Sequence, residues 1–233
     1  MSEFTSTLRK HVEENWNRQI EHPFVKRLGE GTLEIERFKN WIHQDYRYLK
    51  DFSRLFAWAT AKARTLDQMS WYTAVQDLTL NTEMELHREY AKKFGISRDE
   101  LENTPKWPTT QAYTDFLVRS ASEGSLAELV AVLLPCSWGY AWIGKQLEAE
   151  GVPAEKRYAD WIHTYASDEF QESAEWLKEE MNRLAQGSTE RERNLLIDLF
   201  MRSSEYELRF WEMCYHGEGP LIKPEISFEI SGE

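Results

Sequence analysis

Apolar residues recur along most of this chain at intervals of three and four residues, which is the pattern of an amphipathic helix. The longest such pattern covers residues 34–64, and its apolar positions are Phe38, Trp41, Ile42, Tyr46, Tyr48, Leu49, Phe52, Leu55, Phe56 and Ala59. Similar patterns predict helices over residues 5–20, 68–94, 97–102, 109–122, 125–149, 155–165, 168–186 and 189–214. Sustained strand-like alternation occurs only in ISFEI, at residues 226–230.

The segments between these patterns are short, so we expect one domain. The 233 residues include only 11 Gly and 7 Pro, too few for an all-β protein with many tight turns. We find no long linker, no low-complexity run and no internal repeat. The sequence therefore predicts a single all-α domain over residues 1–216, followed by a polar tail over residues 217–233.

Charge and hydropathy limit the classes of partner. The net charge is −12, and the Lys and Arg residues form no extended cluster. Because nucleic-acid binding needs a basic face, we do not expect a nucleic-acid partner. The longest apolar run, LVAVLLPC at 129–136, is too short to span a bilayer, so we expect no membrane partner. The two cysteines have no CxxC spacing and no signal peptide is evident, which favours a reducing compartment, the cytoplasm.

Two acidic residues interrupt apolar helix faces, and these are the most informative positions in the pattern. On a helix, the residues three, four and seven positions from Asp45 are Trp41, Ile42, Tyr48, Leu49 and Phe52. Glu207 lies on a stripe with Leu196, Phe200, Ser203, Phe210, Trp211 and Cys214. An unpaired buried carboxylate is costly, so each acid is either a core residue held by a hydroxyl or helix cap, or a functional group.

The stretch LLPCSWGYAWIG, at residues 133–144, combines a thiol with residues that disturb a helix. Pro135 cannot donate a hydrogen bond to Ala131, which frees that carbonyl and predicts a bend. Gly139 and Gly144 allow another backbone or a ligand to approach closely. A buried free cysteine is usually a small apolar residue, but these neighbours favour an accessible thiol at Cys136. Cys214 has no such neighbours, and we interpret it as structural.

The sequence offers little support for a metal or cofactor site. Glu83 and His87 are four residues apart and could bind a metal together, but a di-iron bundle requires Glu-x-x-His pairs, and the chain has none. The remaining histidines repeat no ligand spacing, and no GxGxxG, Walker or GxSxG motif is present. We therefore expect no metal and no cofactor.

Several motifs in a fixed order resemble the TenA/thiaminase II family. They are HPF at 22–24, QDYRYL at 44–49, ELHREYA at 85–91, AYTDFL at 112–117, GSLAEL at 124–129, LLPCSWGYAWIG at 133–144, YASDEF at 165–170 and YELRFWEMCY at 206–215. The resemblance extends from about residue 8 to 216 and is to family members that carry the central cysteine. It implies a haem-oxygenase-like helical bundle and a homo-oligomer, typically a tetramer. Many relatives end soon after the position of Tyr215, whereas eighteen further residues follow it here, beginning with His216.

The resemblance also implies site residues. The family's nucleophile falls on Cys136, and its two catalytic acids fall on Asp45 and Glu207. The substrate-binding positions are Tyr48, Tyr113, Tyr140, Tyr165 and Phe210. The implied activity is hydrolysis of an aminopyrimidine, either thiamin or its aminomethyl degradation product, to hydroxymethylpyrimidine. Rival interpretations are a non-catalytic regulator and a metal- or quinone-dependent oxidase on the same fold.

The implied chemistry sets requirements on these residues. Flat aromatic rings can stack on a pyrimidine, and carboxylates can bind its amino group and ring nitrogens. To donate a proton to a ring nitrogen, Glu207 needs a raised pKa, which burial beside another carboxylate provides. The same surroundings raise the pKa of Cys136, so we expect a neutral thiol at rest, whose proton leaves through Asp45 or Tyr140 once substrate is bound.

Overall fold

The computed structural model describes residues 3–221, apart from the side chains of Thr82 and Leu86. Its elements are α1 (Phe4–His11), α2 (Glu13–Ile20), α3 (Pro23–Gly29), α4 (Ile35–Lys62), α5 (Leu66–Asp77), the π-helix η1 (Leu78–Glu83), α6 (Met84–Lys93), α7 (Arg98–Asn103), α8 (Pro108–Glu123), α9 (Leu126–Glu150), α10 (Lys156–Ala166), α11 (Asp168–Leu184) and α12 (Glu190–His216). No strand occurs within residues 3–221, which confirms the all-α prediction. The ISFEI segment lies outside the described residues.

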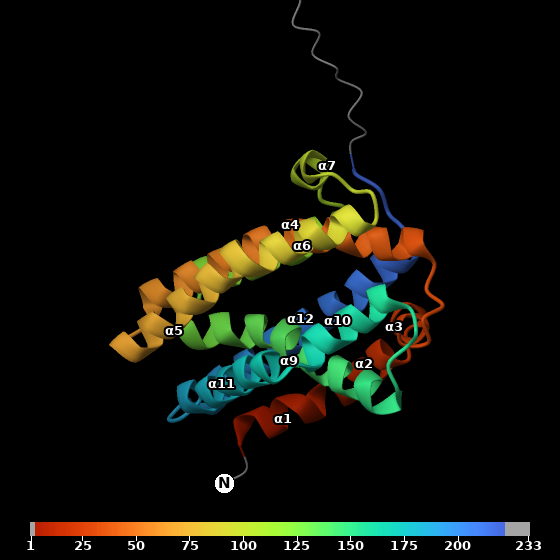
Figure 1. Cartoon of the computed structure of the whole chain (residues 1–233). Helices are drawn as coiled ribbons and strands as arrows, with labels where there is room; N and C mark the ends of the chain where they lie inside the picture. The colour runs from red at the N-terminus through yellow and green to blue at the C-terminus, as the bar shows by residue number, and fades with distance from the viewer. Residues whose placement is uncertain (1–2, 222–233) are drawn as a thin grey trace, which may run out of the picture.

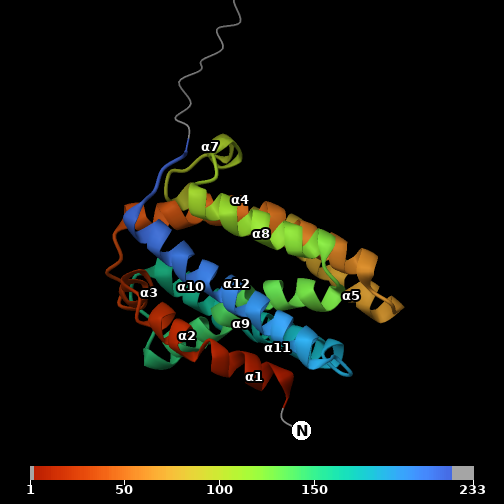
Figure 2. The same cartoon turned by 180° about the vertical axis from the view of Figure 1, so that it is seen from behind.

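The helices form two layers (Figures 1 and 2). One layer contains α4, α5, α6 and α8, and the other contains α9, α10, α11 and α12, with α1 and α2 on its far side. Helix α9 is central because it packs against α8, α10, α11 and α12. Helices α4 and α12 also contact each other and join the two layers. This arrangement leaves the space between α4 and α9–α11 as the place where side chains from both layers meet.

Capping residues define several of the helix boundaries. Ser125 and Thr189 each form a capping box with the glutamate three residues later, so α9 and α12 begin where their apolar patterns begin. At the other end of α12, Gly217 has a positive φ of 78° and ends the helix. The carboxylate of Glu218 then accepts a hydrogen bond from the backbone N–H of Thr109, 3.0 Å away, in the first turn of α8. The first residues of the predicted tail are thus packed on the domain, and residues 222–233 lie outside the described part.

The structure differs from the predicted helices in three places. The helix expected over 5–20 divides at Val12, whose φ of −111° is not helical, because α1 packs on α11 and α12 whereas α2 packs on α12 and α3. The HPF segment begins a helix, α3, in which Pro23 occupies the first turn and His22 caps the backbone N–H of Phe24. The helix expected over 68–94 contains the π-helix at Leu78–Glu83.

Helix α9 is the apolar centre of the fold. Most residues from Leu126 to Gly144 are buried, and the helix continues as one element through Pro135. Among the described residues it is the one helix long and apolar enough to cross a membrane, and 61% of its most apolar window is buried inside the protein. A core helix has the same composition, and here the burial comes from the neighbouring helices.

Candidate active site

A cavity of about 440 Å³ lies between the two layers. Its wall is formed by α4, α5, η1, α9, α10 and α11, and the side chains that line it are Asp45, Tyr48, Leu49, Phe52, Phe56, Val75, Leu78, Thr79, Glu83, Cys136, Ser137, Tyr140, Thr164, Tyr165, Ser167, Glu169, Phe170, Ser173, Ala174 and Leu177. Five of the eight predicted site residues are therefore on the cavity wall: Asp45, Tyr48, Cys136, Tyr140 and Tyr165. Residues from distant parts of the chain meet here because α4, α9 and α10 converge.

Cys136 is partly exposed, and the space that exposes it is this cavity. Burial, and after it the charge of Glu207, raises the pKa of the Cys136 thiol well above its usual range. The Tyr48 hydroxyl lies beside this thiol, and burial, followed by the charge of Cys136, raises the pKa of Tyr48. These surroundings are consistent with the expectation of a neutral thiol at rest, which stays a prediction.

Glu207 is buried immediately behind Cys136 and does not line the cavity. Its carboxyl accepts a hydrogen bond from the Tyr113 hydroxyl, which also contacts the Ser203 hydroxyl at 3.1 Å. Ser203 in turn donates to the backbone carbonyl of Val132, 2.6 Å away, so this chain of bonds fixes α8 and α12 against α9. Burial raises the pKa of Glu207 to about 8, against the opposing hydrogen bond from Tyr113. At neutral pH the side chain is thus mainly a carboxylic acid that can donate a proton, as the proposed chemistry requires.

The aromatic residues form a continuous cluster around the cavity. Tyr140 packs against Tyr165, with ring centroids 4.9 Å apart, and both line the cavity. Tyr113 and Phe210 instead lie behind Tyr48, at centroid distances of 5.3 and 6.0 Å. The structure thus gives Tyr48, Tyr140 and Tyr165 direct access to a ligand, whereas Tyr113 and Phe210 support Tyr48 from behind.

Two residues of the cavity region were not predicted as part of the site. The His87 Nε2 atom lies 2.7 Å from the Asp45 Oδ2 atom, and Glu83 lines the cavity wall. The sequence pattern did show Glu83 and His87 as an i, i+4 pair, but Asp45 is 42 residues away from His87, so nothing local indicated this contact. Within the described part of the chain, no group of three His, Cys, Asp or Glu residues is placed to hold a metal ion.

The cavity also has an apolar part that the motifs did not predict. Beyond Asp45 and Cys136, its wall consists of residues from α4, α5, η1 and α11, namely Phe52, Phe56, Val75, Leu78, Phe170, Ala174 and Leu177. These residues look like ordinary core positions in the sequence because their spacing is helical. Their exposure to a cavity depends on how α5 and α11 are held apart, which only tertiary packing decides.

Comparison with known proteins bears directly on this site. The model of the TENA/THI-4/PQQC family matches residues 9–217. The chain belongs to this family. A relative from Halalkalibacterium halodurans, named aminopyrimidine aminohydrolase, is 41% identical over 216 residues, which are 91% of this chain and 96% of the relative. The family match at residues 9–217 spans the positions of all the predicted site residues, and it confirms the resemblance inferred from the motifs.

Solved structures of the family have the same architecture. A TenA family protein from Silicibacter sp. TM1040, described as a transcription regulator, superposes with a TM-score of 0.86 at 32% identity, covering 92% of this chain and 97% of that one. A domain from Shewanella denitrificans with a haem-oxygenase-like fold superposes with a TM-score of 0.71 at 12% identity, covering 91% of each chain. The second likeness concerns the fold alone, and it confirms the predicted haem-oxygenase-like bundle.

Proposed function

We propose that this chain is an enzyme that hydrolyses aminopyrimidines and releases hydroxymethylpyrimidine, with Cys136 as the nucleophile. The observation that carries the proposal is that the Cys136 thiol lies between a cavity and Glu207, a buried acid whose pKa is raised to about 8. A nucleophile therefore lies on the wall of the ligand site, and a proton donor is in contact with it from behind. The name aminopyrimidine aminohydrolase of similar relatives supports the same activity.

The cavity wall suits a flat heterocycle with an amino group. The rings of Tyr48 and Tyr165 can stack on a pyrimidine, and such aromatic pairs contribute about 0.5–1.5 kcal/mol each. The Asp45 carboxylate can accept hydrogen bonds from the exocyclic amino group. Tyr113 and Phe210 act indirectly in this proposal, by holding the Tyr48 ring in place. The apolar part of the cavity leaves room for a second ring, so thiamin and its aminomethyl degradation product both remain candidate substrates.

The proposed reaction has two halves. In the first, the Cys136 thiol gives its proton to Asp45, directly or through the Tyr140 hydroxyl, and the sulfur adds to the ring carbon beside a ring nitrogen while Glu207 protonates that nitrogen. The electron pair of the adduct then expels the substituent on the exocyclic methylene. An amino group takes up the proton held by Asp45 and leaves as ammonia, whereas a thiazolium leaves as thiazole and Asp45 releases its proton to solvent. In the second half, water adds to this methylene, the C–S bond breaks, and the ring nitrogen returns its proton to Glu207. The proton lost by water restores the thiol, so the enzyme is regenerated.

Product analysis with both substrates tests this proposal. Wild-type protein incubated with thiamin and with aminomethylpyrimidine should form hydroxymethylpyrimidine from at least one of them. Cys136→Ala should abolish turnover, whereas Cys214→Ala should keep it, because Cys214 is a buried cysteine that does not line the cavity. Full turnover by Cys136→Ala would refute the mechanism, and a wild-type protein inactive on both substrates would favour the regulatory alternative.

We also infer that the protein works as a cytoplasmic homo-oligomer, with a tetramer as the expected form. An acidic surface and two free cysteines are consistent with a reducing compartment. Exposed apolar side chains on α4, α5 and η1, which are Trp58, Leu66, Leu78 and Leu80, are candidates for burial between subunits. Sedimentation equilibrium should give a mass of four chains, and a concentration-independent mass of one chain would exclude the assembly.

A further inference from the structure

Asp45 and His87 form a buried pair between two cavities. Asp45 lines the catalytic cavity, and His87 lines a second cavity of about 260 Å³ between α6 and α10. The two cavities share Glu83, Thr164 and Tyr165 as lining residues. Both members of the pair are more than nine-tenths buried, so their contact is sheltered from competing water. The proposed mechanism uses Asp45 and leaves His87 without a role.

The neighbours of the His87 ring determine how many protons it carries. Its Nε2 atom lies 2.7 Å from a carboxylate oxygen of Asp45, and its Nδ1 atom lies 3.1 Å from the backbone carbonyl oxygen of Glu83. A carbonyl oxygen can only accept, so Nδ1 must carry a hydrogen. When Asp45 is ionised, its carboxylate can also only accept, so Nε2 then carries a hydrogen as well. Both bonds are satisfied together when the ring is an imidazolium and Asp45 is a carboxylate.

We propose that His87 is a positioning residue that holds Asp45 ionised and fixes one of its two oxygens, leaving the other oxygen to bind the substrate. This rests on the function proposed above, in which Asp45 receives the amino group of an aminopyrimidine. No other hydrogen bond to the Asp45 side chain is found among the described residues, so the second oxygen is free for a ligand. Because hydrogen bonding to one oxygen restricts rotation of the carboxyl group, the pair presents the other oxygen in a defined direction.

The charges around His87 agree with this assignment. From α4 the ring faces Asp45 and the ring of Trp41, with ring centroids 5.7 Å apart. The other charged side chains that line the second cavity are Glu83 from η1, Glu89 and Lys93 from α6, and Asp160 from α10. Burial lowers the pKa of His87, but the hydrogen bond and charge of Asp45, with the charge of Glu83, more than offset this and raise the pKa overall.

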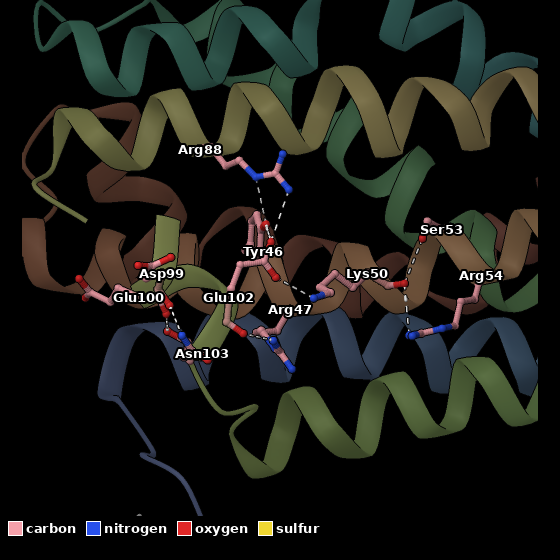
Figure 3. Close-up of polar contacts among 11 residues, drawn as sticks. Tyr46, Arg47, Lys50, Ser53, Arg54, Arg88, Asp99, Glu100, Glu102 and Asn103 are labelled. Atoms are coloured by element: carbon pink, nitrogen blue, oxygen red, sulfur yellow. Dashed lines mark hydrogen bonds and ion pairs between the residues drawn. The ribbon is translucent and has the colours of Figure 1, made fainter. Parts of the chain in front are cut away.

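A second contact lies beside this pair and provides a matched control. Tyr46 and Arg88, the residues that follow Asp45 and His87, also contact each other, with the Arg88 Nε atom 3.1 Å from the Tyr46 hydroxyl (Figure 3). Both are held by the carboxylate of Glu102, which also accepts a hydrogen bond from Lys50 at 2.8 Å (Figure 3). Helices α4 and α6 are thus joined by two adjacent pairs, one facing the cavities and one facing α7. Breaking the outer pair weakens the docking of α6 without touching Asp45.

The first experiment compares His87→Gln with Arg88→Gln. His87→Gln should lower kcat/KM for aminomethylpyrimidine by roughly 10- to 100-fold, the scale of loss when a binding group is misplaced. Its pH profile should also differ from that of the wild type, because the substitution removes the buried His87 ring, whose pKa is raised. The Arg88→Gln variant should keep the pH profile of the wild type. A His87→Gln protein with the wild-type pH profile, or an equal loss in both variants, would reduce His87 to a structural residue.

The second experiment does not depend on turnover, so it separates this proposal from the proposed function. In protein with ¹⁵N-labelled histidine, NMR should show both ring nitrogens of His87 protonated at pH 7.5, where an ordinary histidine is neutral. The His87 signal is identified among those of the six histidines because it is missing from the spectrum of the His87→Gln variant. Asp45→Asn should return the ring to ordinary titration. A neutral His87 at pH 7.5 in the wild-type protein would overturn the proposal even if the enzyme is active.

Discussion

At the scale of single residues, Glu207 is the group whose protonation should govern activity on the alkaline side. Its pKa of about 8 arises from burial, and the hydrogen bond from Tyr113 opposes that rise. Because the proposed step needs the protonated acid, kcat/KM should fall above pH 8. Tyr113→Phe removes the opposing bond, so the alkaline limb should move to higher pH. A pH–rate profile measures this, and a limb that stays in place or moves to lower pH would contradict the assignment.

The resting state of Cys136 leads to a second prediction. Burial and the charge of Glu207 raise the pKa of the thiol, whereas the neighbouring Tyr48 hydroxyl lowers it. Iodoacetamide should therefore alkylate Cys136 slowly at pH 7, with a rate that is still rising at pH 9. Tyr48→Phe should slow alkylation further, because the thiolate loses a hydrogen-bond donor. Mass spectrometry of the modified peptide gives the rate, and a plateau reached below pH 8 would show an activated thiolate.

Sequence reasoning located some of these residues and missed others for an identifiable reason. Asp45 and Glu207 were visible because an acid on an apolar helix face breaks the pattern of its own helix. His87 was visible only as a partner of Glu83, since its contact with Asp45 joins two helices. Tyr113 and Phe210 were expected at the ligand, and the structure places them behind Tyr48. A motif identifies residues near a site, but their distance from the ligand depends on how the helices pack.

At the scale of helices, α9 and α10 cross at Gly144. A Cβ atom at this position would lie 2.7 Å from the backbone carbon of Tyr165 and 2.9 Å from the backbone nitrogen of Ala166. Gly144→Ala should therefore push α10 away, displace Tyr165 from the cavity and cost about 1–3 kcal/mol of stability. Gly139→Ala in the same helix is the matched control, because nothing lies within 4 Å of its added Cβ.

Both variants can be compared by thermal unfolding and by KM. Gly144→Ala should lower the melting temperature and raise KM, because Tyr165 forms part of the proposed ligand wall. Gly139→Ala should be neutral or slightly stabilising, since alanine favours a helix more than glycine does. Equal effects of the two substitutions would mean that the close approach of α9 and α10 does not position the site.

The helices themselves were mostly predictable, and their interruptions were not. Periodicity placed α4 and α8–α12 within a few residues of their observed bounds, because each buries one continuous apolar face. The π-helix at Leu78–Glu83 left no such signal, although it contributes Leu78, Thr79 and Glu83 to the cavity wall. A π-helix is retained where tertiary contacts favour it over the regular α-helix, so the residues that stabilise it are on other elements.

At the scale of the whole molecule, the site lies where two helical layers are held slightly apart. Direct contacts between α5 and α11, which both contribute to the cavity wall, help to maintain this spacing: the rings of Trp71 in α5 and Trp176 in α11 stack with centroids 3.6 Å apart. Nearby, Gln68 donates a hydrogen bond to the buried carboxylate of Glu180 at 2.6 Å, which again joins α5 to α11. The fold class follows from composition and periodicity. The cavity does not follow from them, because it requires two layers that are in close contact in some places and separated in others.

Concentrating buried acids in this space should make stability depend on pH. Glu207 has a pKa near 4.5 when unfolded and about 8 when folded, so between these values the folded state holds a proton that the unfolded state has lost. Stability from this group therefore falls as pH rises from 4.5 to 8, by at most about 1.4 kcal/mol per pH unit. His87 and Glu83, whose pKa values are also raised, act in the same direction, and His22, whose pKa is lowered, opposes them.

Comparing the wild type with Glu207→Gln isolates this contribution, because the substituted amide does not titrate. Urea unfolding at a series of pH values should show the wild type losing stability relative to the variant between pH 5 and pH 8, with the difference becoming constant above about pH 9. Glu102→Gln is a useful contrast: its carboxylate is held by Lys50, Tyr46 and Arg88, and its pKa is lowered to about 2. Stability from Glu102 is therefore complete above pH 4.5 and is lost on acidification, so this variant should leave the decline between pH 5 and pH 8 unchanged. If the wild type and Glu207→Gln gave parallel curves over that range, Glu207 would be ionised in the folded protein and could not serve as the proton donor.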